Sequence, residues 1–443
     1  MRKVPNPAPA QAGTPRPRRA GAPGPRAPGN GRAVLAWRGE QAGAPVLRPR
    51  PNLAAAGLTI DGIVPLPGQY PLPSFGFRYW NAAETLARAT SVWQDANEAP
   101  WHWHGGGALA IRLATGPLPQ AAYTRGDLCF VAAAPGLAEG PALLCHALGH
   151  AVLDALRPDL WDAASQEVAA FHDIFADLTA VFAALALPEW RAEVIAAGPG
   201  RIAALLHPQG AAPTASTFAL AMLDMLAALV RTEAAMRGRT ADAALLGAAR
   251  KAARLLATAV RRVPVVPNFL AQIAAELAIA AWVQEGPAFG MHLRALFSDR
   301  HVLAPTAATA TYDPHEAEDG TEIAPDHRQS LPIVAIDAAA FGLRQPLLLQ
   351  PASQSPRLAV AALAENGTPR DPIHPTVAAC HFAAELIRTG RAAPPAPLHR
   401  PRPQAPGTTH RLVDNGRTLL LQRTRFICTA QAVSVHPASR SIG

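Results

Sequence analysis

The chain has 443 residues, of which 49% are hydrophobic and 16% charged, so it is long enough for two or three domains around a large buried core. This composition excludes a mostly disordered protein. No apolar run reaches the roughly 18 uninterrupted residues that a membrane helix needs, so we expect no membrane span.

The formal net charge of +8 belongs to the N-terminal segment. Residues 1–50 hold ten basic groups and one acid, so the rest of the chain carries about −1. This segment is rich in Pro, Gly and Arg, and we expect it to be disordered. A basic tail of this kind can contact nucleic acid or anionic lipid, but a solvated leader is the simpler interpretation. A nucleic-acid partner is therefore the weakest of the functional hypotheses.

Cysteine usage and the N-terminus indicate the cellular compartment. The four cysteines are scattered and form no C-x-x-C pair, which is typical of a reducing environment. Residues 1–33 contain no continuous apolar segment of the kind that a secretory signal requires. We therefore expect a soluble, cytoplasmic protein.

The pattern along the chain predicts an α+β fold. A mixed lobe with a small sheet is expected over residues 51–140, a helical lobe over 141–300, a loop over 301–330 and a mixed α/β region over 331–443. Core strands are predicted at Ala108–Leu113 and Leu128–Ala132, and an Asn-Gly turn predicts a hairpin of Arg411–Val413 with Arg417–Val433. Helices are predicted at Ala82–Asp95, Pro141–Leu156, Ala163–Leu187, Thr217–Met236, Ala241–Arg261, Phe269–Gln284 and Ala288–Phe297.

The candidate chemistry begins with His146 and His150, four residues apart on a predicted helix. This spacing places both imidazoles on one face, where they can share a metal ion. An H-x-x-x-H pair also occurs by chance, and a half-buried histidine couple is the alternative. Gly149 lies inside the same helix at a cost of about 1 kcal/mol relative to Ala, which indicates that something passes close to its backbone.

The next predicted helix supplies carboxylates. It is apolar almost all round and therefore buried, yet it carries Asp173 and Asp177 one turn apart. Buried carboxylates need partners, and the two histidines are available one helix earlier. We expect His146, His150 and Asp173 to bind Zn²⁺ with a fourth position open, and Asp177 to accept a hydrogen bond from a ligand imidazole. Asp154 is expected to support the second imidazole similarly, although caps or salt bridges to arginines explain such acids as well.

At these residues the sequence resembles the thermolysin-like (gluzincin) zinc metalloendopeptidases. The segment from His146 to Asp154 resembles their zinc helix, with its H-E-x-x-H pattern, and the segment from Phe171 to Asp177 resembles their second metal helix. The resemblance covers about 45 residues. It implies a zincin core with a mixed N-terminal lobe, a helical C-terminal lobe and zinc between them, acting on a peptide or protein.

Two departures from the family pattern weaken the expected activity. Ala147 stands where the family has its general base, and the loss of a general base typically costs roughly 10²–10⁴-fold in rate. Asp173 stands where the third ligand is a Glu. No local motif identifies the second histidine of such enzymes, for which His207 and His292 are the candidates. We therefore predict a degenerate metallopeptidase with weak or no hydrolysis, or alternatively a peptide-binding scaffold that uses the ancestral cleft.

The other motifs in the sequence do not indicate a second kind of active site. Trp101-His-Trp103-His followed by three glycines resembles a metal or aromatic cluster, but is more often a loop leading into a strand. Cys145 precedes His146 directly, and neighbours in a helix do not face each other, so a Cys–His nucleophile is not expected. The sequence contains no G-x-S-x-G motif, which argues against a serine hydrolase.

Overall fold

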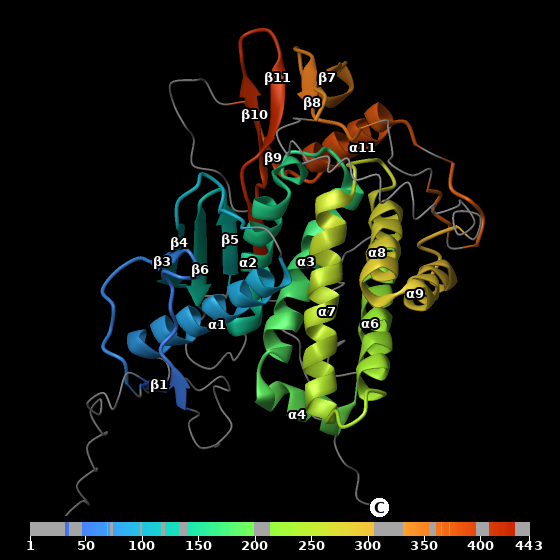
Figure 1. The fold of residues 1–443 in the computed structure, drawn as a ribbon. Coiled ribbons are helices and arrows are strands. Elements are labelled where there is room, and N and C mark those ends of the chain that lie inside the picture. Colours follow the sequence, from blue (N-terminus) through green and yellow to red (C-terminus); the bar gives the residue numbers. More distant parts are fainter. Residues whose placement is uncertain are drawn as a thin grey trace, which may run out of the picture.

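The computed structural model describes most of the chain beyond residue 46. The described residues are 32–34, 47–68, 70, 74–97, 100–116, 120–132, 140–198, 213–304, 331–353, 360–364, 366–371, 373–395 and 407–429. The predicted N-terminal tail and the loop over 301–330 therefore lie almost wholly outside them. Within them the fold has a sheet on one side, a bundle of helices beside it and a second small sheet above both (Figure 1). The predicted α+β class is confirmed.

The first sheet has the strand order β12-β5-β6-β4-β3, and the part next to the helices is antiparallel. β3, β4 and β6 run parallel, whereas β5 pairs antiparallel with both β6 and β12. β1 and β2 form a separate antiparallel pair. The strands are β1 (Arg32–Val34), β2 (Leu47–Pro49), β3 (Leu58–Ile60), β4 (Leu109–Thr115), β5 (Gln120–Thr124), β6 (Asp127–Ala132) and β12 (Phe426–Thr429).

Most helices of the bundle lie close to the predicted ones, but the first begins at Phe75 rather than at Ala82, and the helix at Pro188–Ala197 was not predicted. Side chains of Ser74, Ser165 and Thr240 accept hydrogen bonds from backbone N–H groups in the first turns of α1, α3 and α7, which fixes these starts. The helices are α1 (Phe75–Ala96), α2 (Gly140–Leu156), α3 (Gln166–Leu185), α4 (Pro188–Ala197), α6 (Pro213–Ala234), α7 (Ala241–Arg262), α8 (Phe269–Glu285) and α9 (Pro287–Asp299), with a 3-10 turn at Pro158–Leu160.

α3 is the central helix of the core. Its length and composition would let it cross a membrane, but 83% of its most apolar window is buried inside the protein. It packs on α2, where Gly149 makes the close approach possible. A Cβ at Gly149 would stand 2.5 Å from the Cα of Ala176 and 2.9 Å from Thr179 Oγ1. The glycine therefore does what its position in the sequence predicted, since it lets the backbone of α3 come close.

The second sheet has the order β7-β8-β11-β10-β9, and α11 packs against it. The Asn415-Gly416 turn joins β10 and β11 in an antiparallel hairpin, as predicted. The elements are β7 (Val334–Ile336), β8 (Leu347–Leu349), α11 (Pro375–Arg388), β9 (Ala392–Ala393), β10 (His410–Asp414) and β11 (Leu419–Arg423), with a 3-10 turn at Ala339–Phe341.

One sequence prediction in this region is wrong. The second hairpin strand does not continue from Arg417 towards Val433, because it stops at Arg423. The backbone N–H groups of Thr424 and Arg425 both donate to the carbonyl of Thr409, which turns the chain out of the hairpin. The next residues form β12 and join the first sheet. The C-terminal region therefore completes the N-terminal lobe.

Candidate metal centre

α2 presents both predicted histidines towards the end of the first sheet that carries β5 and β12. The imidazoles of His146 and His150 lie one turn apart with their ring centroids 5.0 Å from each other. His150 is buried, whereas 18% of the side-chain surface of His146 is exposed to solvent. The α2–α3 packing and β12 together enclose this face of α2.

The third residue at this point is Cys428, from β12. The ligand atoms of His146, His150 and Cys428 all lie within 4.8 Å of one another, so the three side chains can reach one metal ion. Cys428 is buried and forms no disulfide. Nothing local in the sequence points to this cysteine, because β12 is far from α2 in the chain and only the fold brings them together.

Asp177 takes the supporting position expected of it. Its carboxylate oxygen lies 2.7 Å from Nδ1 of His146, and its side chain is largely buried. With Nδ1 engaged, the other ring nitrogen of His146 is left for a metal. Burial acts to lower the pKa of His146, but Cys428 and Asp177 outweigh it and hold that pKa well above its usual value.

His150 is surrounded by rings. Phe426 stacks on it with the ring centroids 4.2 Å apart and the planes 7° from parallel, and His172 lies 5.8 Å away. Its Nδ1 atom is buried without a hydrogen-bond partner. Burial, assisted by His146, His172 and Arg423, holds the pKa of His150 well below its usual value, so the ring is neutral. A neutral imidazole is the form that binds metals.

Asp173 does not have the environment that the sequence predicted. Its side chain is 68% exposed, so it is not one of two buried carboxylates. Its carboxylate lies 3.8 Å from Nε2 of His150, which keeps it near the site but outside the group of three side chains that converge. Its neighbours His172 and Ile174 are buried, so of these three residues only Asp173 is exposed.

Asp154 bonds to residues of the first sheet and its adjoining turn rather than to His150. Its fully buried carboxylate accepts a hydrogen bond of 2.9 Å from the hydroxyl of Tyr123 and three from the guanidinium of Arg125, the shortest also 2.9 Å. These contacts join the end of α2 to β5. The predicted support for the second imidazole is therefore replaced by a tie between helix and strand.

Ala147, which the resemblance predicted at the general-base position, is fully buried. A methyl group can neither accept nor donate a proton, so this position contributes no acid–base chemistry. Cys145 is also buried, and burial raises the pKa of its thiol to about 12, which leaves it an unreactive neutral group.

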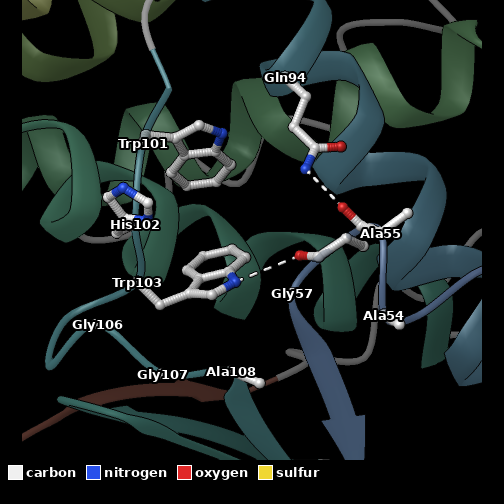
Figure 2. A pocket seen from close by; sticks show the side chains of 11 residues that line it. Ala54, Ala55, Gly57, Gln94, Trp101, His102, Trp103, Gly106, Gly107 and Ala108 are labelled. Atoms are coloured by element: carbon white, nitrogen blue, oxygen red, sulfur yellow. Dashed lines mark hydrogen bonds between the residues drawn. The ribbon is translucent and has the colours of Figure 1, made fainter.

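The remaining predicted residues lie elsewhere. His292 is exposed on α9, on the side of the bundle away from the first sheet (Figure 1), and His207 lies outside the described residues. The Trp-His segment forms the loop that leads into β4, as the simpler interpretation held. Figure 2 shows Trp103 donating to the carbonyl of Ala56 beside a cavity of about 290 Å³. Gln94 donates to the carbonyl of Ala55 at the same cavity.

The chemistry open to the centre follows from its donor atoms. Two imidazole nitrogens and a thiolate sulfur are ligands that zinc accepts in tetrahedral sites. Comparisons of the chain with protein-family models, with curated proteins and with solved structures found no match.

Proposed function

We propose that this chain is a zinc-binding protein built on a metallopeptidase-like pair of helices, and that it does not hydrolyse peptides. The observation that carries the proposal is the convergence of His146, His150 and Cys428 within 4.8 Å. The thermolysin-like ancestry rests on the resemblance of α2 and α3 to the two metal helices of that family.

The residues present fit a zinc ion. His150 holds a buried ring nitrogen without a hydrogen-bond partner, which is costly unless something binds it. His146 is oriented by Asp177, as ligand imidazoles usually are by a carboxylate. The ligand set is His146, His150 and Cys428, in place of the His146, His150 and Asp173 expected from the sequence. When bound, zinc would supply a Lewis-acidic centre and a thiolate–metal bond.

The side chains around the centre argue against hydrolysis. Ala147 offers no group that could take a proton from water, and a general base is typically worth about 10²–10⁴ in rate. Cys428 adds a thiolate, whereas the hydrolytic sites of the resembled family use a Glu. β12 also occupies the edge of the first sheet beside the centre, where it pairs with β5, so a substrate strand could not pair there.

The direct test is the metal content of the purified protein. We expect about one zinc per chain in the wild type, and less than a tenth of that in His150→Ala and in Cys428→Ser. Cys380→Ser is the matched control, because Cys380 lies on α11 against the second sheet and should leave zinc content unchanged. A wild-type protein without zinc, and without a thermal shift on adding zinc, contradicts the metal part of the proposal.

The second part of the proposal needs a separate assay. Zinc-loaded protein is incubated with a mixture of peptides, and the products are read by mass spectrometry. We expect no cleavage above that of the His150→Ala variant. Cleavage that depends on His150 would show that another residue replaces the missing base.

A further inference from the structure

Arg423, the last residue of β11, is a charged group beside the candidate metal centre, and it is only 5% exposed. Trp161 holds it from two directions. The Nε of the guanidinium donates to the carbonyl of Trp161 at 2.9 Å, and the indole of Trp161 donates to the carbonyl of Arg423 at 3.3 Å. The guanidinium carbon also lies 4.2 Å from the ring centroid of Phe426, which stacks on His150. These contacts fix the orientation of the guanidinium.

The two terminal nitrogens of this guanidinium have no hydrogen bond to any residue that the structure describes, and Arg423 forms no ion pair with the acids described. Other arginines nearby are paired, such as Arg125 with Asp154 and Asp162. Burial, together with Arg391, lowers the pKa of Arg423 to about 10, so the group still carries its charge at neutral pH. A buried charge without a paired counter-charge is costly, and a bound anion would offset that cost.

A second guanidinium belongs to Arg391, directly before β9. Its carbonyl accepts hydrogen bonds from the backbone N–H groups of Thr409 and His410, which fixes this position beside β10. Arg391 is exposed, and its side chain likewise forms no ion pair within the described part of the chain. It acts electrostatically on both Arg423 and Asp173, so its positive charge adds to that of Arg423. Two guanidiniums of the same charge in one place favour an anion between them.

Asp173 shows that solvent reaches this place. Its side chain is 68% exposed, yet the protein around it raises its pKa by burial, against the opposing effects of His146, Arg423 and Arg391. A carboxylate that is open to solvent but desolvated by its surroundings lies in a recess rather than on an outward surface. Ala169, one turn before Asp173 on α3, packs on the second sheet. The recess therefore lies against the sheet that carries the two arginines.

We propose that Arg423 and Arg391 form a binding site for the carboxylate group of a small organic anion, beside the two histidines of α2. A guanidinium binds a carboxylate through two parallel hydrogen bonds, and the two unpartnered nitrogens of Arg423 can supply such a pair. A carboxylate carries a single negative charge, whereas a phosphate dianion would be repelled more strongly by Asp173. The site uses no zinc, so it goes beyond the proposed metal centre and does not depend on it.

The first test measures the binding of benzoate to the full-length protein in EDTA, by saturation-transfer NMR. Benzamide is the matched probe, because it has the same shape without the negative charge. We expect benzoate to bind at least about ten-fold more tightly than benzamide or inorganic phosphate. Equal binding of benzoate and benzamide, or no binding of benzoate, overturns the site. Tighter binding of phosphate overturns the assignment to a carboxylate.

Substitutions then locate the binding. Arg391→Gln removes an exposed guanidinium, so the fold should stay intact, and we expect benzoate to bind about ten-fold more weakly. Arg423→Lys keeps the charge but loses the planar fork, and it should weaken binding similarly. Arg411→Gln is the matched control, because Arg411 is exposed on the neighbouring strand β10 and bonds to Gln422. Unchanged affinity in Arg391→Gln, or an equal loss in Arg411→Gln, overturns the site even if Arg423→Lys does not fold.

A comparison with zinc separates this site from the proposed metal centre. We expect benzoate to bind Cys428→Ser in EDTA as tightly as it binds the wild type, because the site uses the guanidiniums and not the thiol. Benzoate that binds only in the presence of zinc, and not to Cys428→Ser, would be a ligand of the metal, which overturns the arginine site. A wild-type protein that binds benzoate but no zinc supports the arginine site and contradicts only the metal centre.

Discussion

The ring of Phe426 lies flat on the imidazole of His150, with centroids 4.2 Å apart, and it comes from β12, which is far from α2 in the chain. This contact places Cys428, two residues further on, beside both histidines of α2. The three side chains of the candidate metal centre are therefore brought together only when β12 pairs with β5.

Asp177 and Asp154 should differ sharply in their effect on zinc. Asp177→Asn removes the carboxylate that holds His146, so we expect zinc affinity to fall about 10–100-fold. Asp154→Asn is the matched control, because Asp154 contacts Tyr123 and Arg125. It should lower the thermal midpoint and leave zinc affinity within about two-fold. Competition with a chromophoric chelator measures the zinc affinity of both variants. Equal losses of affinity would contradict the assigned role of Asp177.

Gly149→Ala should destabilise the protein although alanine is the better helix former. Helix propensity favours alanine by about 1 kcal/mol, but the new Cβ would stand 2.5 Å from the backbone of Ala176. We expect a net loss of about 1–3 kcal/mol in the free energy of unfolding, measured by urea denaturation. Gly107→Ala is the control, since a Cβ there meets nothing within 4 Å. A stabilised Gly149→Ala variant would mean that α2 and α3 lie further apart.

Restoring the acids of the resembled family should not restore hydrolysis. Ala147→Glu places a carboxylate at a fully buried position, so we expect it to lower the free energy of unfolding by about 1–3 kcal/mol. The Ala147→Glu/Asp173→Glu protein should still leave peptides uncleaved, because Cys428 and β12 remain at the site. Ala147→Gln separates the effect of size from that of charge. Cleavage by the double variant, read by mass spectrometry, would show that the cleft is open to substrate.

Acid should destabilise the second sheet through His410. Burial, with Arg423 and Arg391, holds the pKa of His410 far below its usual value, so the ring is neutral in the folded state. The unfolded chain takes up a proton below about pH 6.5, so the stability from this group is present above that pH and is lost as pH falls. The loss approaches about 1.4 kcal/mol per pH unit. Urea denaturation between pH 7.5 and 5 should show a shallower dependence for His410→Gln, and identical slopes would contradict this.

Much of the helical lobe follows directly from the sequence. The apolar periodicity, the capping residues and the prolines place most of the bundle helices to within a few residues, since these signals are local. Gly149 and the all-round apolar character of α3 predicted a tight, buried helix pair, and this prediction is confirmed. The His146–Asp177 contact also follows from two helical spacings and a close pair of helices.

What the sequence could not predict depends on distant strand pairing. Cys428 follows a short apolar run that continues the pattern of β11, and the turn at Thr424 is set by the carbonyl of Thr409, just before β10. Helical periodicity places Asp173 on the same face as Asp177, but it does not reveal that the Asp173 side chain is exposed. The sequence therefore predicted Asp173 as the third side chain, whereas the structure brings Cys428 of β12 to the two histidines.

X-ray absorption at the zinc edge of the purified full-length protein shows whether Cys428 is a ligand. We expect a single sulfur at about 2.3 Å and two imidazole nitrogens at about 2.0–2.1 Å, with the sulfur contribution lost in Cys428→Ser. A zinc coordinated only by nitrogen and oxygen in the wild type would contradict the proposed metal centre, because Cys428 would then not be a ligand.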